Sequence, residues 1–223
     1  MGIITENINR YRASLPQGVE LCAVSKFHPE TSIREAYDAG QRIFGESRVQ
    51  ELLPKQQNLP KDIEWHFIGH LQTNKVKYIA PFVSLIQSGD SAKLLKEINL
   101  QAQKNGRVID VLLQLHVAQE QTKSGFLPTE LEEYMVSGEW RNLKNIHLCG
   151  VMGMATFTED QELIKSEFKT IRQEFEKIKQ QYFSEDEKFS YCSMGMSDDY
   201  LIAIEHGSNI VRVGTGIFGE RIY

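Results

Sequence analysis

The sequence of 223 residues has few cysteines, no long hydrophobic run and no basic stripe. Its three cysteines, Cys22, Cys149 and Cys192, lie far apart and form no C-x-x-C pair, which predicts reduced, mostly buried thiols. No run of about eighteen apolar residues occurs, and the first residues lack the apolar core of a signal peptide. We therefore expect a cytoplasmic protein with no membrane partner. The net charge of −5 is spread along the chain, which argues against a nucleic-acid partner.

Two further features are missing, and both bear on the fold. No G-x-G-x-x-G follows the first apolar run, so a dinucleotide-binding open sheet is disfavoured. No linker rich in Pro, Gly or Ser and no shift in composition divides the chain. Since α/β barrels reach about 250 residues as one domain, we expect residues 1–223 to form a single domain.

Short apolar runs alternate with amphipathic segments along the chain, which predicts parallel βαβ units. Eight runs predict strands, at residues 19–24, 41–44, 64–68, 82–86, 108–115, 145–151, 188–192 and 209–213. Helical spacing of apolar residues occurs at 29–39, 47–57, 73–80, 92–104 and 158–182. The expected fold class is α/β, a single (β/α)₈ TIM barrel with an extra N-terminal helix at 5–14. A doubly wound open sheet is the alternative.

Lys26 follows the first predicted strand, at the rim where such barrels place their sites. Partial desolvation there would lower the pKa of the amine and free it to attack a carbonyl. The alternative is a lysine that reaches into solvent. Position alone does not decide between them.

The last predicted strand contains Arg212 and ends at Gly214 and Thr215, while Ser193 and Ser197 lie in the loop after the strand before it. Backbone N–H groups in such turns can bind a phosphate, and barrels commonly bind phosphate after strands 7 and 8. Two ordinary strand-to-helix turns are the alternative. A carbonyl-seeking lysine beside a phosphate site suggests pyridoxal 5′-phosphate (PLP) bound as a Schiff base.

Five stretches resemble the YggS/PROSC family of PLP homeostasis proteins, which is related to the N-terminal barrel of fold-type III alanine racemases. They are AVSKFHP, AGQRIFGESRVQE, WHFIGHLQTNK, GVMGM and SMGMSDDYLIAIEHGSNIVRVGTGIFGER, and together they extend from the first predicted strand to the C-terminus. The resemblance implies that Lys26 forms a covalent imine with PLP and that Arg212 faces its pyridine nitrogen. It also implies phosphate contacts by Ser193, Met194, Gly214 and Thr215.

Two further positions follow from the same resemblance. Ile68 matches an apolar residue that lines the cofactor pocket. Ser47 stands where the family usually has an asparagine near the cofactor ring. Serine is shorter and has one hydroxyl in place of an amide, so the departure implies a weaker contact between Ser47 and the ring.

The resemblance implies a PLP-binding protein without robust catalytic activity, acting in the homeostasis of PLP (vitamin B6) and of amino- and keto-acid pools. Arg212 cannot accept a proton, so the ring nitrogen would stay unprotonated and withdraw electrons poorly. We expect no catalytic residue, PLP-dependent apoenzymes as further partners, and a monomer, because the chain ends where a racemase would begin its second domain.

Two other functions stay open on the sequence. One is a small fold-type III PLP enzyme, an amino-acid racemase or lyase, with Lys26 as a base. The other is a Schiff-base aldolase that uses Lys26 without a cofactor. We expect no metal site, because His66 and His70 lie at a strand end and do not form a helical metal-binding pair.

Overall fold

The computed structural model describes residues 2–119 and 124–220, and in these residues eight parallel strands form a closed barrel. Neighbours in sequence are neighbours in the sheet, and β8 pairs with β1 to close it. The strands are β1 (Glu20–Val24), β2 (Ile43–Glu46), β3 (Glu64–Phe67), β4 (Leu85–Gly89), β5 (Ile109–Gln114), β6 (Ile146–Met152), β7 (Tyr191–Ser193) and β8 (Ile210–Val213). The predicted (β/α)₈ barrel is confirmed, and the open-sheet alternative is wrong.

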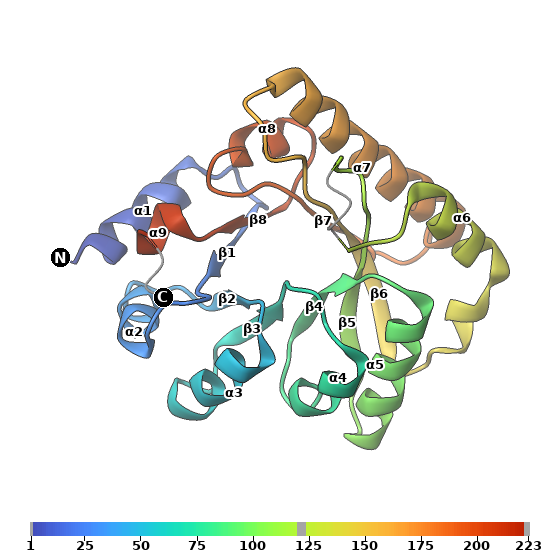
Figure 1. Ribbon diagram of the computed structural model, residues 1–223, viewed down its shortest axis with the longest axis horizontal. Coiled ribbons are helices and arrows are strands. Elements are labelled where there is room, and N and C mark those ends of the chain that lie inside the picture. The colour runs from blue at the N-terminus through green and yellow to red at the C-terminus, as the bar shows by residue number, and fades with distance from the viewer. Residues whose placement is uncertain (1, 120–123, 221–223) are drawn as a thin grey trace.

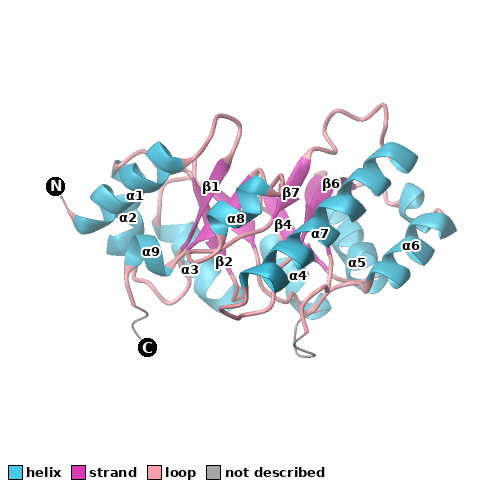
Figure 2. Ribbon diagram, turned by 90° about the horizontal axis from the view of Figure 1, so that it is seen from above, coloured by secondary structure: helices cyan, strands magenta, loops and turns pink. Residues whose placement is uncertain are grey.

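Helices surround the strands on the outside of the barrel (Figures 1 and 2). They are α1 (Ile3–Ser14), α2 (Glu30–Asp38), α3 (Val49–Asn58), α4 (Thr73–Ile79), α5 (Ala92–Lys104), α6 (Pro128–Ser137), the 3₁₀ helix η1 (Glu139–Asn142), α7 (Gln161–Tyr182), α8 (Tyr200–Glu205) and α9 (Thr215–Phe218). The predicted N-terminal helix α1 lies beside α9, where Asn7 Nδ2 donates to Ile217 O at 3.0 Å (Figure 1). No helix in the described part of the chain is long and apolar enough to cross a membrane.

The longest helix, α7, illustrates how the sequence pattern covers the barrel. The Asp160 side chain caps its N-terminus by accepting from the backbone N–H groups of Glu162 and Leu163. Its buried face carries apolar side chains at helical spacing, namely Ile164, Phe168, Ile171, Phe175 and Ile178. Burying each of these side chains contributes about 1.5–3 kcal/mol, so packing rather than helix propensity holds α7 in place.

Side chains that point into the barrel form layers, because alternate residues of a strand face the same side. On β8, Ile210 belongs to an apolar cluster together with Cys22, Leu85, Leu112, Cys149 and Met152. Two residues later Arg212 lies in a buried polar layer, and two residues later again Gly214 lines a cavity. The barrel interior is therefore filled by apolar and then polar side chains, and a cavity opens at the C-terminal ends of its strands. All three cysteines are free and buried, as predicted.

The fourth strand differs from its predicted position at residues 82–86. Phe82 and Val83 instead follow the end of α4, since their N–H groups donate to Ile79 O. The strand continues to Gly89, where a Cβ would lie 2.7 Å from Leu112 O, so the chains approach too closely for a side chain. The polar Gln87 and Ser88 are fully buried within it, and their polarity concealed the strand in the sequence. Similarly, β7 begins at Tyr191, later than predicted.

Candidate functional site

A cavity of about 470 Å³ lies at the C-terminal ends of the strands. Six of the eight predicted site residues line it: Lys26, Ser47, Ile68, Arg212, Gly214 and Thr215. Ser193 and Met194 are fully buried and do not line it. The remaining lining residues are Val24, His28, Gly69, His70, Gln114, Ser124, Met154, Phe157, Met196, Ser197 and Asp198.

The two-residue repeat of the strands brings these side chains together. Val24 and Lys26 follow one another on the inward face of β1 and its extension, as Ile68 and His70 do after β3. The cavity therefore receives an amine from β1 and an apolar wall from β3. This grouping follows from barrel closure and could not come from an open sheet.

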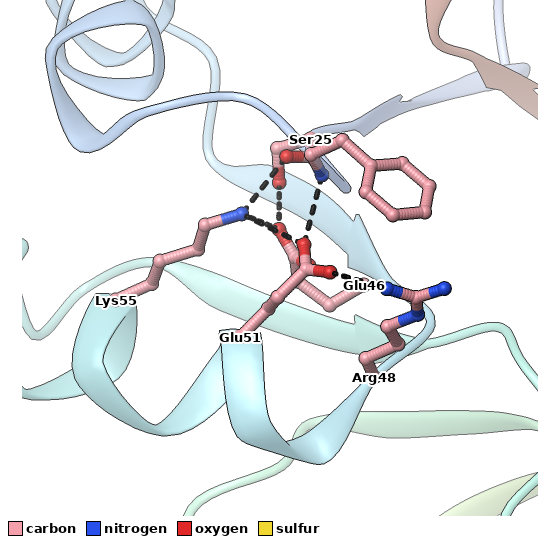
Figure 3. Close-up of polar contacts among 6 residues, drawn as sticks. Ser25, Glu46, Arg48, Glu51 and Lys55 are labelled. Atoms are coloured by element: carbon pink, nitrogen blue, oxygen red, sulfur yellow. Dashed lines mark hydrogen bonds and ion pairs between the residues drawn. The ribbon is translucent and has the colours of Figure 1, made fainter. Parts of the chain in front are cut away.

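Lys26 stands in a turn whose preceding residue is held by a buried ion pair (Figure 3). Lys55 Nζ, on α3, donates to Ser25 O at 2.9 Å and to Glu46 Oε1 at 2.7 Å. The Ser25 hydroxyl donates to the same Glu46 oxygen at 2.6 Å. Glu46 is fully buried, and burial raises the pKa of its carboxyl while Lys55 lowers it. The ion pair therefore holds Ser25 in place, and Ser25 directly precedes Lys26 in the chain.

The residue after Lys26 is held by the same helix. Phe27 N donates to Glu51 Oε2 at 2.8 Å, and Arg48 lies over the Phe27 ring at 4.6 Å. Arg48 also contacts Glu51 (Figure 3). Phe27 has a φ of 66°, a left-handed conformation that costs an aromatic residue about 1–2 kcal/mol. Contacts from α3 on both sides of Lys26 offset this strain and set the direction in which the lysine leaves β1.

Sequence reasoning missed this role of α3. The structure buries the Glu46 side chain completely. The available signal was the spacing of Glu51 and Lys55, which are four residues apart on a helix and so share a face. A lysine that falls on the core-facing side of an amphipathic helix needs a buried anion, and Glu46 provides it.

Arg212 brings a positive charge to the inner wall of the cavity. The side chain is 4% exposed, donating from Nη2 to Gly153 O at 2.9 Å and from Nη1 to Ser193 Oγ at 2.6 Å. Burial lowers the pKa of its guanidinium, which nevertheless stays charged because an arginine pKa begins so high. Among the described residues no carboxylate lies within ion-pair distance of it. Its charge is thus available to an electron-rich group in the cavity.

The neighbouring turns after β7 and β8 meet at the same end of the cavity. Gly214 and Thr215 lie in one turn and Ser197 in the other, and Gly216 N donates to Ser197 Oγ at 3.3 Å. Ser193 ends β7 and Met194 begins the loop after it, and neither residue lines the cavity. Gly195 between them and Ser197 has a φ of 93°, and a Cβ there would lie 2.6 Å from the Ala203 side chain, so the loop requires glycine.

His70 forms the opposite edge of the cavity. Its Nδ1 lies 2.8 Å from Asp90 Oδ2 and 3.2 Å from Ser124 Oγ, and Gln114 Nε2 donates to Ser124 O at 2.6 Å. Asp90 and Ser124 both approach the same ring nitrogen, so these residues do not form a nucleophilic triad, which needs the hydroxyl at the other nitrogen. They form a polar edge of the cavity that Lys26 also lines.

Below the cavity, His66 is buried, and burial lowers its pKa from 6.5 to about 3. The unfolded chain therefore binds a proton between these two values that the folded chain does not. We expect the free energy of unfolding to fall as the pH drops below about 6.5, by up to ~1.4 kcal/mol per pH unit. Urea denaturation at a series of pH values measures the slope.

His66→Gln should remove this acid-dependent component, whereas His206→Gln, at the end of α8, should retain it. Equal slopes in wild type and His66→Gln would show that His66 is not the group responsible.

A second group of possible ligands lies away from the cavity. Ligand atoms of Asp110, His147 and Cys149 lie within 4.8 Å of one another. His147 also contacts Asp186 through Nε2, and the Cys149 thiol donates to Val111 O. Burial raises the pKa of that thiol well above its ordinary value, which disfavours the thiolate that a metal needs. We assign no ion to it, and the absence of a metal site stays a prediction.

Comparison with known proteins links this cavity to a protein family. The family model of the alanine racemase N-terminal domain matches residues 2–222. A pyridoxal phosphate homeostasis protein of Aquifex aeolicus is 42% identical over 206 residues, covering 92% of this chain and 88% of that protein. One from Schizosaccharomyces pombe is 37% identical over 207 residues, covering 92% and 85%.

Solved structures agree with this assignment. PipY of Synechococcus elongatus, solved with PLP bound, superposes with a TM-score of 0.88 at 35% identity, covering 97% of this chain and all of PipY. An alanine racemase of Clostridium difficile has a TM-score of 0.75 at 16% identity, with 97% of this chain covering 56% of the racemase, and shows the shared fold.

The fold and the cavity thus define a barrel of the alanine racemase N-terminal type. Within that class the chain belongs to the family of pyridoxal phosphate homeostasis proteins.

Proposed function

We propose that this protein binds PLP in the barrel cavity, holds it as a Schiff base on Lys26, and serves the homeostasis of PLP and of amino- and keto-acid pools without robust catalytic activity. One observation carries the proposal. A single cavity is lined by a lysine, a buried arginine and the turns after β7 and β8. The names of the relatives and the PLP bound to PipY support it.

The residues present fit the cofactor chemically. When bound, PLP supplies an aldehyde that condenses with an amine and a pyridine ring that withdraws electrons. Lys26 provides the amine from a turn that α3 holds rigid. Ser197 and Thr215 provide hydroxyls, and Gly214 leaves room for the backbone to approach a phosphate.

Arg212 supports binding rather than robust turnover. A guanidinium only donates hydrogen bonds, so Arg212 would hold the ring nitrogen of bound PLP as an acceptor, without a proton. Bound PLP would then withdraw electrons poorly, and the residues of the cavity would bind and release the cofactor more readily than they would use it.

The other predicted contacts complete the proposed site. Ile68 and Ser47 both line the cavity. Ile68 would pack against the ring, and Ser47 would lie near it with a shorter polar group than the asparagine usual in the family. Ser193 and Met194 act through the loop that they begin, whose later residues Met196 and Ser197 line the cavity.

Adding PLP to the purified protein tests the proposal directly. We expect the visible absorbance of a protonated imine, its loss on borohydride treatment, and a covalent mass increase of one reduced cofactor per chain. A protein that shows neither the absorbance nor the adduct would not be a PLP Schiff-base protein.

The turns after β7 and β8, which we propose bind the phosphate, lead to a separate prediction. Thr215→Val and Ser197→Ala each remove a hydroxyl at that end of the cavity, and each should weaken PLP binding about tenfold, since a hydrogen bond to a charged group contributes about 1.5–3 kcal/mol. Fluorescence titration with PLP and with pyridoxal, which lacks the phosphate, measures the difference.

Binding of pyridoxal should change little in both variants. Thr170→Val, on the outer face of α7, is the matched control for Thr215→Val. Equal weakening for both ligands would place the phosphate elsewhere.

We further propose a cytoplasmic monomer that exchanges PLP with PLP-dependent apoenzymes. Three free, buried cysteines are consistent with a reducing compartment. Sedimentation velocity of the PLP-loaded protein tests the monomer, and spectroscopic transfer to an apoenzyme tests the exchange.

The edge formed by His70 and Asp90 favours a second candidate, a small PLP-dependent racemase or lyase. A histidine oriented by a carboxylate could serve as a second acid or base opposite Lys26. Incubating the PLP-loaded protein with amino acids in deuterated water separates the two functions. Exchange of the α-proton would support the enzyme, and its absence for every amino acid would exclude it.

A further inference from the structure

Four side chains form a continuous hydrogen-bonded chain across the barrel interior. Arg212 Nη1, from β8, donates to Ser193 Oγ at 2.6 Å, and Ser193 Oγ, from β7, donates to Gln87 Oε1 at 2.7 Å. Gln87 Nε2, on β4, lies 3.0 Å from His66 Nδ1, on β3. All four side chains are buried, with exposures of 4% or less. We call this set, Arg212, Ser193, Gln87 and His66, the interior relay.

Arginine at one end sets the direction of every bond in the interior relay. Since a guanidinium has no acceptor, Ser193 must accept from Arg212, and its single hydrogen is left for Gln87 Oε1. That contact orients the Gln87 amide so that its NH₂ group faces His66, whose Nδ1 must then be the accepting nitrogen. A neutral His66 meets this requirement, and burial keeps it neutral by lowering its pKa to about 3.

Arg212 depends on this chain for its orientation. Its hydrogen-bond partners within the described residues are neutral, the Ser193 hydroxyl and Gly153 O, and no carboxylate in the same ranges fixes it by an ion pair. The Ser193 contact therefore supplies half of the hydrogen bonds that aim the guanidinium. Ser193 is fully buried and does not line the cavity, so its hydroxyl serves Arg212 rather than the cavity contents.

We propose that Ser193, Gln87 and His66 are positioning residues that aim Arg212 at the ring nitrogen of the bound cofactor and thereby keep that nitrogen unprotonated. The inference rests on the proposed function and deepens it, by assigning residues of β3, β4 and β7 to the control of the ring. A shorter or apolar side chain in place of Ser193 or Gln87 breaks this series of hydrogen bonds. The guanidinium of Arg212 then keeps its charge but no longer points at the ring nitrogen.

Three variants test the relay. Ser193→Ala removes the central hydroxyl, and Gln87→Leu removes the acceptor that Ser193 needs. Gln87→Glu keeps an oxygen acceptor for Ser193, and His66 as its Nδ1–H tautomer can donate to the second carboxylate oxygen. This variant should therefore preserve the orientation of Arg212. Ser88→Ala is the matched control. Ser88 is as buried as Ser193 and lies on β4 next to Gln87, and its hydroxyl has no hydrogen-bond partner within the described residues.

The readout is the nuclear magnetic resonance of an isotopically labelled ring nitrogen in the PLP-loaded protein, followed against pH. In wild type the nitrogen should stay unprotonated. In Ser193→Ala and Gln87→Leu the midpoint of its protonation should rise by about one pH unit, a tenfold change in that equilibrium, because a misaimed guanidinium no longer donates to it. PLP affinity should fall about tenfold in the same variants. A purely structural role would lower stability without moving the nitrogen.

Each outcome decides the matter. Rising midpoints in Ser193→Ala and Gln87→Leu, with Gln87→Glu and Ser88→Ala close to wild type, support the relay. A Ser193→Ala midpoint equal to that of Ser88→Ala in folded, PLP-loaded protein overturns it, as does a Gln87→Glu variant that behaves like Gln87→Leu. Wild type that shows no visible imine band overturns the proposed function, whereas a normal band with an unresponsive ring nitrogen overturns this inference alone.

Discussion

Lys26→Ala is expected to abolish covalent PLP binding, with no visible imine band and no adduct after borohydride. The amine is the only part of Lys26 that can condense with an aldehyde, and alanine leaves the rest of the cavity intact. Arg212 and the Thr215 turn should still bind PLP, but at least about a hundredfold more weakly, since a covalent bond is lost. Absorbance titration and intact-protein mass spectrometry measure both effects.

Lys26→Arg separates the chemistry from the charge. Arginine keeps a positive charge at the end of β1 but cannot form the imine, so it should lose the visible band as completely as alanine does. Lys55 cannot replace Lys26, because its Nζ is engaged by Ser25 O and Glu46 Oε1 in a buried position. A cofactor adduct that survives in Lys26→Ala, mapped to another lysine, would contradict the assignment.

Lys26 and Arg212 could be predicted to lie near each other because the signal was local and periodic. Short apolar strands alternating with amphipathic helices predict a barrel, and closure of a barrel places β8 beside β1. Residues at the ends of these strands then share one rim. The position of Thr215 followed from the same reasoning, because a strand end followed by glycines needs only local sequence to be recognised.

The supporting residues could not be predicted, because their partners lie far away in the sequence. Gln87 is polar, so it weakened the signal of its own strand, and its partner Ser193 is 106 residues away. Ser193 was expected at the phosphate because it precedes a cavity loop, yet its side chain faces the barrel interior. Only the closed barrel brings Ser193 and Gln87 together, so that the serine hydroxyl donates to the glutamine side chain and neither polar group is left buried without a partner.

The buried ion pair behind Lys26 leads to the second large effect. Lys55→Met should lower the free energy of unfolding by about 3–5 kcal/mol, because it leaves the Glu46 carboxylate buried without a cation. Glu46 Oε2 already has no hydrogen-bond partner within the described residues, so the carboxylate has little further compensation. Urea denaturation of the apoprotein measures the loss. Lys93→Met, at an exposed lysine of α5, is the matched control and should change stability by less than about 0.5 kcal/mol.

The pH dependence identifies the cause of that loss. Burial already raises the pKa of Glu46 above its ordinary 4.5, and loss of Lys55 should raise it further, because Lys55 lowers it. A raised carboxyl pKa favours the folded state below the unfolded value and costs stability as the pH rises through the folded value. The deficit of Lys55→Met should therefore be largest near neutral pH and shrink as the pH falls toward about 4.5. Pairing it with Glu46→Gln should restore most of the stability at neutral pH. A deficit that is independent of pH and unchanged in the double variant would mean that lost packing of Lys55, rather than an unpaired carboxylate, limits the fold behind Lys26.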